Sequence, residues 1–465
     1  MTASLLEKES TGGANARVGF EYQDAYVLEK LPRWLAQNAF SHVVSEAIGD
    51  MEVCYFNPDG GIVRVMYEAK NYALSVGDFW KEISRFKVAH ETSPREFPRF
   101  AMVCVGYNSN TNPLISKIER LRGVGSSYEK DSPVLAIGRK ELVEWASNNG
   151  HSADLAGFAL DRVDFISYAS ESADQAFIGE LEKNFPELDL SVRQAARLRD
   201  VYKGQIARSS SRPVYRKELE SAICDLSIAE RNNWLSKPVR IHAVARAIEY
   251  YELGMDVSSF NGNERASKSS EEWRSLLLAA HNIAEFIKTS TLRRCVEFDG
   301  KQRMSTAGVL GFAFSATLGF DLTLEHNGNS YRTTTHSRST GPFFIESVLP
   351  GNSSTSEGIA CIGFPTVVGA DISMGDTGVT AELPRLSLES ARAISNIEDL
   401  NLAVAESKDA LVRFRSQNRI SKLYVFIKAP SIFPFALGHR LNGVCAVQLN
   451  DWVDSQYIPT ALLPS

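Results

Sequence analysis

Residues 49–70 read GDMEVCYFNPDGGIVRVMYEAK, and this stretch carries the clearest structural signal in the N-terminal part of the chain. The runs Met51–Phe56 and Ile62–Ala69 are rich in β-branched, aromatic and other apolar residues, which is typical of strands. The intervening Asn57–Gly61 combines Asn, Pro, Asp and Gly, which favour tight turns. The stretch therefore predicts two neighbouring strands joined as a hairpin.

Three charged residues of this hairpin, Asp50, Glu68 and Lys70, form the candidate catalytic group. Side chains two residues apart on a strand share a face, so Glu68 and Lys70 project together, and Asp50 on the neighbouring strand can approach Glu68. Two carboxylates can hold one Mg²⁺ (or Mn²⁺), which activates water for attack on a phosphodiester. We predict Asp50 and Glu68 as metal ligands and Lys70 as the group that orients the water or neutralises charge. A same-face ion pair on an edge strand is the alternative for Glu68 and Lys70.

The residues around the hairpin predict an α/β domain over residues 1–150. Apolar spacing predicts a helix at Ala16–Leu31, which we expect Pro32 to end. Further along we expect, in order, a helix at Val76–Val88, a strand at Phe100–Val105, a helix near Leu114–Leu121 and a strand at Pro133–Ile137. Alternation of this kind is typical of a sheet covered by helices.

From about Leu160 to Leu253 the pattern predicts mainly helices, the polar stretch Val257–Ser270 predicts a boundary loop, and a second α/β region follows. The pieces Arg294–Leu324 and Leu423–Leu449 each follow the order strand, helix, strand, which indicates two related halves. Between these pieces we expect a helix at Ser387–Ser395.

Composition and charge narrow the functional classes. The 465 residues are 44% apolar and 23% charged, with a net charge of −6, which excludes a disordered chain and a strongly basic DNA-packaging protein. The six cysteines include no CxxC pair, so neither a zinc site nor a disulfide framework is expected. The longest uncharged run, Met304–Phe320, is too short and too polar to span a bilayer. We therefore expect a cytoplasmic protein with no membrane partner.

One basic segment stands out from this acidic background. Between residues 193 and 217, eight Lys and Arg residues accompany a single acid, Asp200, and two tyrosines are interleaved. Such a patch supplies sequence-independent affinity for phosphates. A solvated helical face paired with the acidic stretch Glu171–Asp189 is the alternative. The candidate DNA contacts are Arg193, Arg197, Lys203 and Arg208.

Two turns of the C-terminal part have the features of phosphate sites. Val296–Thr306 and Phe426–Ser431 each lead from a strand through a polar, basic turn into a helix, where open α/β sheets bind ligands and a helix N-terminus favours phosphate. Ordinary loops with solvated Lys and Arg are the alternative. The candidate ligand-binding residues are Lys301, Gln302, Arg303, Ser305, Thr306, Phe364, Lys428, Pro430, Gly438, His439 and Arg440.

The motif Asp50…Glu68-x-Lys70, in this order of elements, resembles the PD-(D/E)xK signature of restriction-endonuclease-like nucleases. The opening Gly19-Phe20-Glu21-Tyr22-Gln23 is similar to the G-F-x-Y-Q start of nuclease domains in bacterial cyclic-oligonucleotide antiphage effectors. The resemblance implies that an acid or amide of the first helix can reach the metal, with an exposed polar side chain as the alternative. The additional active-site candidates are Glu21, Gln23 and Glu46.

The segments Leu423–Pro430, Phe435–Arg440 and Val447–Trp452 resemble SAVED domains, which sense cyclic oligonucleotides. The resemblance implies a C-terminal domain over residues 230–465, built of two fused CARF-like, Rossmann-type halves and joined to the restriction-endonuclease-like domain by a helical extension at 151–229.

The combination of these two domains in one chain resembles the CD-NTase-associated effectors of bacterial CBASS antiphage systems. This resemblance implies a metal-dependent, largely non-specific endonuclease for double-stranded DNA. It also implies that an adenine-containing cyclic trinucleotide, made by a partner CD-NTase, binds the SAVED domain and drives homo-oligomerisation. Two alternatives stay open: a restriction-type nuclease whose C-terminal domain reads DNA, and a catalytically inactive ligand-sensing scaffold.

Overall fold

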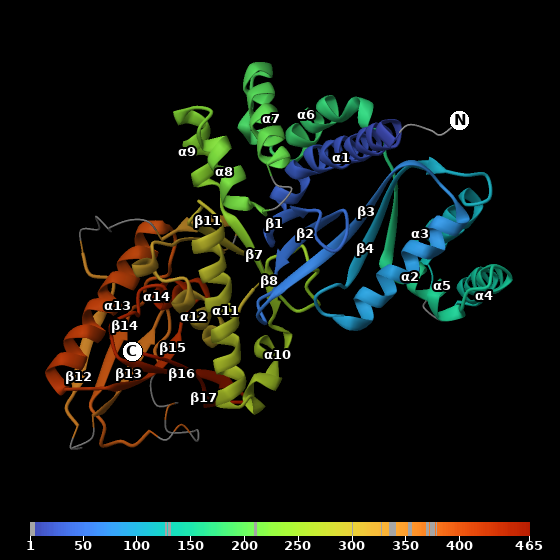
Figure 1. Cartoon of the computed structure of the whole chain (residues 1–465). Coiled ribbons are helices and arrows are strands. Elements are labelled where there is room, and N and C mark those ends of the chain that lie inside the picture. Colours follow the sequence, from blue (N-terminus) through green and yellow to red (C-terminus); the bar gives the residue numbers. More distant parts are fainter. Residues whose placement is uncertain are drawn as a thin grey trace. The chain divides into compact units, whose positions relative to one another are not determined.

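The computed structural model of the chain describes residues 5–125, 128, 132–208, 212–299, 301–326, 328–333, 341–351, 356–368, 372, 377 and 379–465, with only the backbone for 5–17, 124–125 and 326. The chain divides into an N-terminal unit, Met1–Asn57 with Gly61–Trp234, and a C-terminal unit, Pro58–Gly60 with Leu235–Ser465. Figure 1 shows the first in blue to green and the second mainly in yellow to red.

The N-terminal unit contains α1 (Leu5–Ala36), β1 (Phe40–Ser45), β2 (Met51–Phe56), β3 (Ile62–Leu74), α2 (Val76–Thr92), β4 (Arg99–Tyr107), α3 (Asn112–Gly125), α4 (Pro133–Asn148), α5 (Ala153–Arg162), β5 (Val163–Ser167), α6 (Ala173–Asn184), α7 (Val192–Ala207), β6 (Val214–Tyr215), α8 (Arg216–Cys224) and most of α9 (Ile228–Ser236).

Its strands form one six-stranded sheet in the order β5-β4-β3-β2-β1-β6. The hairpin strands β2 and β3 pair antiparallel, whereas β3, β4 and β5 run parallel. On one face of the sheet, Tyr67 of β3 contacts Tyr26 and Trp34 of α1. On the other face, Met66 of β3 lies in a hydrophobic core with Phe79 of α2. Successive residues of β3 thus face opposite layers, as the alternation of a strand requires.

The C-terminal unit contains β7 (Val239–Val244), β8 (Gly254–Asp256), α10 (Ser258–Asn261), α11 (Ser270–Ser290), β9 (Cys295–Asp299), α12 (Met304–Ala313), β10 (Asp321–His326), β11 (Asn329–Arg332), β12 (Ile345–Leu349), β13 (Glu357–Gly363), β14 (Arg385–Glu389), α13 (Ile397–Asn418), β15 (Lys422–Lys428), α14 (Ile432–Gly438), β16 (Ala446–Val453) and β17 (Gln456–Leu463).

Two sheets build this unit: β11-β10-β9-β7-β8 and β12-β14-β13-β15-β16-β17. The helices α12 and α14 connect the two halves through very close packing. A Cβ atom on Gly311 of α12 would lie 2.0 Å from the carbonyl oxygen of Phe435, and one on Gly438 would lie 2.4 Å from that of Gly308. Glycine is therefore needed at this contact because any side chain would force the helices apart.

The predicted α/β class is confirmed, including the Met51–Phe56 strand and the hairpin that it forms. The predicted helix end at Pro32 is wrong, because α1 continues to Ala36 with Pro32 inside it. The last turn of α1 buries Trp34 and Leu35, and this packing offsets the hydrogen bond that proline cannot make.

Two predicted elements have the wrong type. Pro133–Ile137 begins the helix α4, since proline is tolerated in a first helical turn and the buried Leu135, Leu142 and Ala146 follow helical spacing. Ser387–Ser395 overlaps the strand β14, in which Leu386 and Leu388 are buried with the period of two that a strand gives.

None of the described helices has both the length and the apolar character that crossing a bilayer requires. All six cysteines are buried and free.

Candidate active site

The hairpin of β2 and β3 brings Asp50 and Glu68 together. Met51 pairs with Tyr67 across the two antiparallel strands, so the preceding Asp50 lies beside Glu68. A carboxylate oxygen of Asp50 (Oδ2) accepts a hydrogen bond from the backbone N–H of Ala69 at 2.7 Å. On β3, Lys70 Nζ donates to Glu68 Oε1 at 2.6 Å, so the predicted same-face arrangement of these two residues is what the structure shows.

The electrostatics of this hairpin reflect two carboxylates held close together. Burial raises the pKa of Asp50 to about 6, and the charge of Glu68 acts in the same direction. Burial by itself lowers the pKa of Lys70, but the hydrogen bond and charge of Glu68 raise it above its ordinary value. The site thus holds two closely spaced carboxyl groups, and a further cation bound beside them would stabilise their charged forms.

Two further charged residues, Glu82 and Arg85, reach the same place from α2. Arg85 forms an ion pair with Glu68 Oε2, and its Nε lies 3.1 Å from Glu82 Oε2. Lys70 Nζ lies 3.4 Å from Glu82 Oε1. The sequence reasoning missed both residues. A signal was present, because Glu82 shares the buried face of α2 with Phe79 and an unpaired carboxylate is rarely buried there.

The additional candidates lie to the side of this cluster. Glu21 is exposed and Gln23 half-buried on α1, which packs on the opposite face of the sheet from Glu68. Glu46 is exposed, and its backbone N–H donates to the carbonyl oxygen of Asp50 at 2.9 Å. Asp24 of α1, which the sequence reasoning did not select, has its pKa raised to about 6 by burial and by the charge of Glu46.

The side chains of the basic segment differ in their ion pairs and in their exposure. Arg199 and Lys203 of α7 both contact Asp174 of α6, at 3.3 and 2.5 Å, which is the pairing that the acidic-stretch alternative describes. Arg193 and Arg197 lie one helical turn apart on the exposed side of α7, and neither forms an ion pair with a described residue. The exposed members of the run are Arg193, Arg197, Lys203, Arg208, Arg212 and Lys217.

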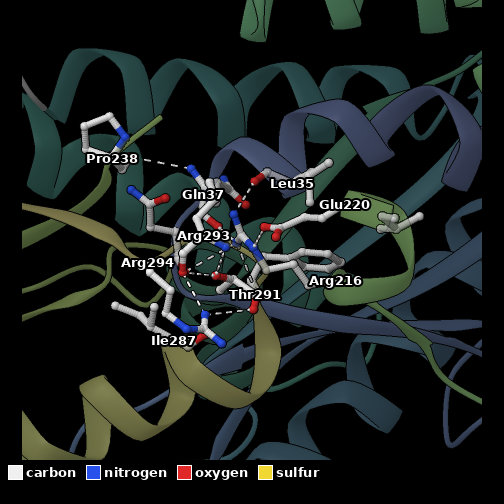
Figure 2. A network of polar contacts seen from close by, with 12 residues as sticks. Leu35, Gln37, Arg216, Glu220, Pro238, Ile287, Thr291, Arg293 and Arg294 are labelled. Atoms are coloured by element: carbon white, nitrogen blue, oxygen red, sulfur yellow. Dashed lines mark hydrogen bonds and ion pairs between the residues drawn. The ribbon is translucent and has the colours of Figure 1, made fainter. Parts of the chain in front are cut away.

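Arg216, from the same segment, is fully buried and cannot contact DNA. Its Nε donates to Glu220 Oε1 at 2.8 Å, and its two terminal nitrogens donate to the carbonyl oxygens of Gln37 and Leu35, each at 2.9 Å (Figure 2). Arg216 thus ties α8 to the C-terminal end of α1, where helix carbonyls have no partner within the helix.

The C-terminal unit contains a cavity of about 610 Å³ beside β9 and β10. Its walls combine two cations with three acids and aromatic rings, among them Arg240, Lys301, Glu297, Asp299, Glu325 and Phe435. The cavity lies near the carboxyl end of the parallel strand β9, where open α/β sheets bind ligands.

The predicted ligand-binding residues fall into different places. Lys301 and Gln302 line the cavity. Arg303 is held at its backbone N–H by Asn261 Oδ1 at 2.9 Å. Lys428 and Arg440 are exposed, and Pro430 lies in the turn before α14.

The other predicted ligand-binding residues are buried among protein groups. Ser305 Oγ donates to Asp451 Oδ1 at 2.7 Å, and Thr306 Oγ1 donates to the carbonyl oxygen of Phe260 at 3.1 Å. Burial lowers the pKa of His439 to about 4, so this ring is neutral at pH 7. The remaining two, Gly438 and Phe364, lie in the α12–α14 contact and in an aromatic cluster with Phe433.

Two family descriptions match the chain. Residues 11–210 match the family described as Cap4, dsDNA endonuclease domain. Residues 280–463 match the family described as SMODS-associated and fused to various effectors sensor domain, abbreviated SAVED.

Full-length relatives and solved structures agree with these matches. CD-NTase-associated protein 4 of Moraxella osloensis is 51% identical over 463 residues, and its namesake from an Acinetobacter species is 52% identical over 465, each match covering 100% of both chains. The Cap4 SAVED/CARF-domain receptor of Acinetobacter baumannii, solved with the cyclic trinucleotide 2′3′3′-cAAA, is 48% identical with a TM-score of 0.89, covering 96% of this chain and 99% of that one. The corresponding Moraxella osloensis receptor is 47% identical with a TM-score of 0.83, covering 96% and 100%.

Proposed function

The chain belongs to the CD-NTase-associated protein 4 (Cap4) family, and from this premise we propose that a cyclic trinucleotide bound by its C-terminal unit activates metal-dependent DNA cleavage by its N-terminal unit. The chain joins a double-stranded DNA endonuclease domain to a SAVED sensor domain. We propose domain limits of 1–150 for the nuclease core, 151–229 for the helical extension and 230–465 for the sensor.

The observation that carries the catalytic part is the convergence of Asp50, Glu68 and Lys70 on the hairpin. Asp50 and Glu68 supply the hard oxygen donors that Mg²⁺ or Mn²⁺ prefers. The raised pKa of Asp50, which follows from burial beside Glu68, supports a fit to a divalent cation, since a cation would stabilise both anions. Among the described residues no three His, Cys, Asp or Glu side chains form a ready-made ligand group, so water and DNA would complete the coordination.

The residues of the chain divide the work of hydrolysis as follows. A divalent ion held by Asp50 and Glu68 would lower the pKa of a water molecule and stabilise charge on the phosphate. Lys70, fixed by Glu68 at 2.6 Å, orients that water or neutralises the same developing charge. The water oxygen bonds to phosphorus, the bond from phosphorus to the leaving sugar oxygen breaks, and the proton of the water passes to solvent or to the leaving oxygen.

The cavity of the C-terminal unit is the proposed messenger site. Its volume of about 610 Å³ lies in the range of ligand pockets. Arg240 and Lys301 supply positive charge for phosphates, and Phe435 supplies an apolar wall for a base. The relative solved with 2′3′3′-cAAA supports an adenine-containing cyclic trinucleotide as the ligand. A CD-NTase is the proposed source of this messenger.

Ligand-driven homo-oligomerisation is the proposed link between sensor and nuclease. One hydrolytic site cuts one strand, so cutting both strands of a duplex calls for two sites close together. The messenger can drive this association only if it binds the assembled state more tightly than the single chain.

The test is an incubation of linear plasmid DNA with the full-length protein, Mg²⁺ and a panel of cyclic di- and trinucleotides. We expect fragmentation only when both Mg²⁺ and a cyclic trinucleotide are present, and none after EDTA is added. Light scattering on the same mixtures should show a larger assembly with the activating nucleotide. Cutting without any nucleotide would contradict sensor control and favour a restriction-type nuclease, whereas binding of a nucleotide without cutting would favour an inactive scaffold.

The exposed arginines of α7 are the proposed DNA contacts of the helical extension. The double variant Arg193→Ala/Arg197→Ala should weaken DNA binding and reduce the slope of log affinity against log salt by about 2, because each phosphate contact contributes about 0.9. The matched control is Arg199→Ala/Lys203→Ala, which removes equal charge, but charge that Asp174 and Asp200 already neutralise. Binding is measured by fluorescence anisotropy at several salt concentrations without metal, and equal effects of the two double variants would contradict the assignment.

A further inference from the structure

Glu68 is one of four charged side chains that form a closed ring of ion pairs. Glu68 contacts Lys70 through one oxygen and Arg85 through the other, and Glu82 in turn contacts Lys70 at 3.4 Å and Arg85 at 3.1 Å. Anions and cations therefore alternate, and both oxygens of Glu68 are engaged by cationic groups of the chain itself.

The four members differ in their access to solvent. The side chains of Glu68 and Glu82 are 4% and 7% exposed, and that of Lys70 is 20% exposed. Arg85, at 43%, is the most exposed of the four. Arg85 is therefore the member that can turn into water most readily, and both buried glutamates would then still have Lys70 as a partner.

We propose that Arg85 is a positioning residue that occupies Glu68 until a divalent cation takes its place, and that Glu82 retains Lys70 when Glu68 turns to the cation. The inference rests on the proposed use of Glu68 as a metal ligand. A carboxylate oxygen that accepts a charge-assisted hydrogen bond from a guanidinium has less electron density to offer a metal ion, so the two cations compete. Glu82 supplies the second anion that Lys70 needs once Glu68 is shared.

Metal binding without DNA or nucleotide tests the competition directly. Isothermal titration of the full-length protein with Mn²⁺ should give an affinity about tenfold higher for Arg85→Ala than for the wild type, because a hydrogen bond to a charged group is removed from the competing state. Arg85→Lys, which keeps the positive charge, should stay close to the wild type.

Arg64→Ala is the matched control. Arg64 also pairs with a buried glutamate of the same sheet, Glu52, at 2.9 Å, but this pair lies outside the ring. The Arg64→Ala variant should bind Mn²⁺ with an affinity within twofold of that of the wild type. Circular dichroism confirms that each variant is folded.

The variant Glu82→Gln should change the Mn²⁺ affinity in the opposite direction from Arg85→Ala. Without Glu82, both Lys70 and Arg85 depend on Glu68 alone, so Mn²⁺ should bind about tenfold more weakly. A purely structural role would make both Arg85→Ala and Glu82→Gln weaken binding, and this result would overturn the inference. If the wild type itself binds no Mn²⁺, the proposed metal dependence fails; if it binds and Arg85→Ala is unchanged, only the exchange fails.

Discussion

Replacement of Lys70 with alanine is expected to lower the rate of nucleotide-activated DNA cleavage by a factor of about 10²–10⁴, the usual contribution of a positioned proton-transfer or charge-stabilising group. The reason lies in the geometry of the ring. The Lys70 ammonium group is held 2.6 Å from Glu68 and 3.4 Å from Glu82. Of these two, Glu68 is a proposed metal ligand, together with Asp50. Alanine removes this fixed charge without adding bulk to the sheet.

The measurement is the initial rate of plasmid cleavage at saturating Mg²⁺ and activating nucleotide. Lys81→Ala is the control, because Lys81 is an exposed lysine on α2 outside the ring. It should cleave like the wild type, and both variants should bind the nucleotide with unchanged affinity because the sensor domain is untouched. Cleavage by Lys70→Ala within threefold of the wild type would exclude Lys70 from the chemistry.

Replacement of Arg216 with alanine is expected to destabilise the N-terminal unit by about 3–5 kcal/mol, the usual effect of breaking a buried ion pair from one side. The side chains of Arg216 and Glu220 are both fully buried. The variant would leave the Glu220 carboxylate without its cation, and would also leave the carbonyl oxygens of Leu35 and Gln37 without this donor in the interior (Figure 2). Each such orphaned group lowers stability further.

Thermal unfolding with intrinsic fluorescence checks this prediction, with an expected fall in the melting temperature of the N-terminal unit of roughly 6–20 °C. Arg212→Ala is the control from the same segment, because its ion pair with Glu218 is 3.6 Å long and its side chain is 64% exposed. Its melting temperature should change by less than about 3 °C. Similar shifts in melting temperature for Arg216→Ala and Arg212→Ala would show that the buried contacts of Arg216 do not stabilise the N-terminal unit.

The hairpin and its acid-x-lysine motif could be predicted because their signals are local. The alternation of apolar residues and the turn cluster between Met51–Phe56 and Ile62–Ala69 need no distant partner to be recognised. Pro133–Ile137 and Ser387–Ser395 were assigned wrongly because segments of five and nine residues are too short to show a reliable hydrophobic period. Their type depended on residues outside each segment, namely Leu142 on the same face of α4 and the neighbouring strands of β14.

The basic segment shows that a pattern of charges along the sequence does not reveal which charged side chains are buried. Arg193 and Arg216 belong to the same basic run of the sequence, yet Arg216 is buried as a structural link and Arg193 is exposed. Burial of a charge depends on whether distant carbonyl and carboxylate groups converge on it, and no count along the chain contains that information.

Strand alternation and motif spacing, which act over a few residues, were enough to predict the α/β class and the Asp50…Glu68-x-Lys70 group, whereas the order of a nuclease followed by a sensor came from the family resemblances. Which charges meet depends on the tertiary structure: Arg85 reaches Glu68, and Glu82 reaches Lys70, only because α2 packs on the face of β3 that carries Glu68 and Lys70. The tertiary structure also decided that Arg199 and Lys203 neutralise Asp174. Coulombic pairing depends on distance in space, and packing of helices on the sheet sets that distance.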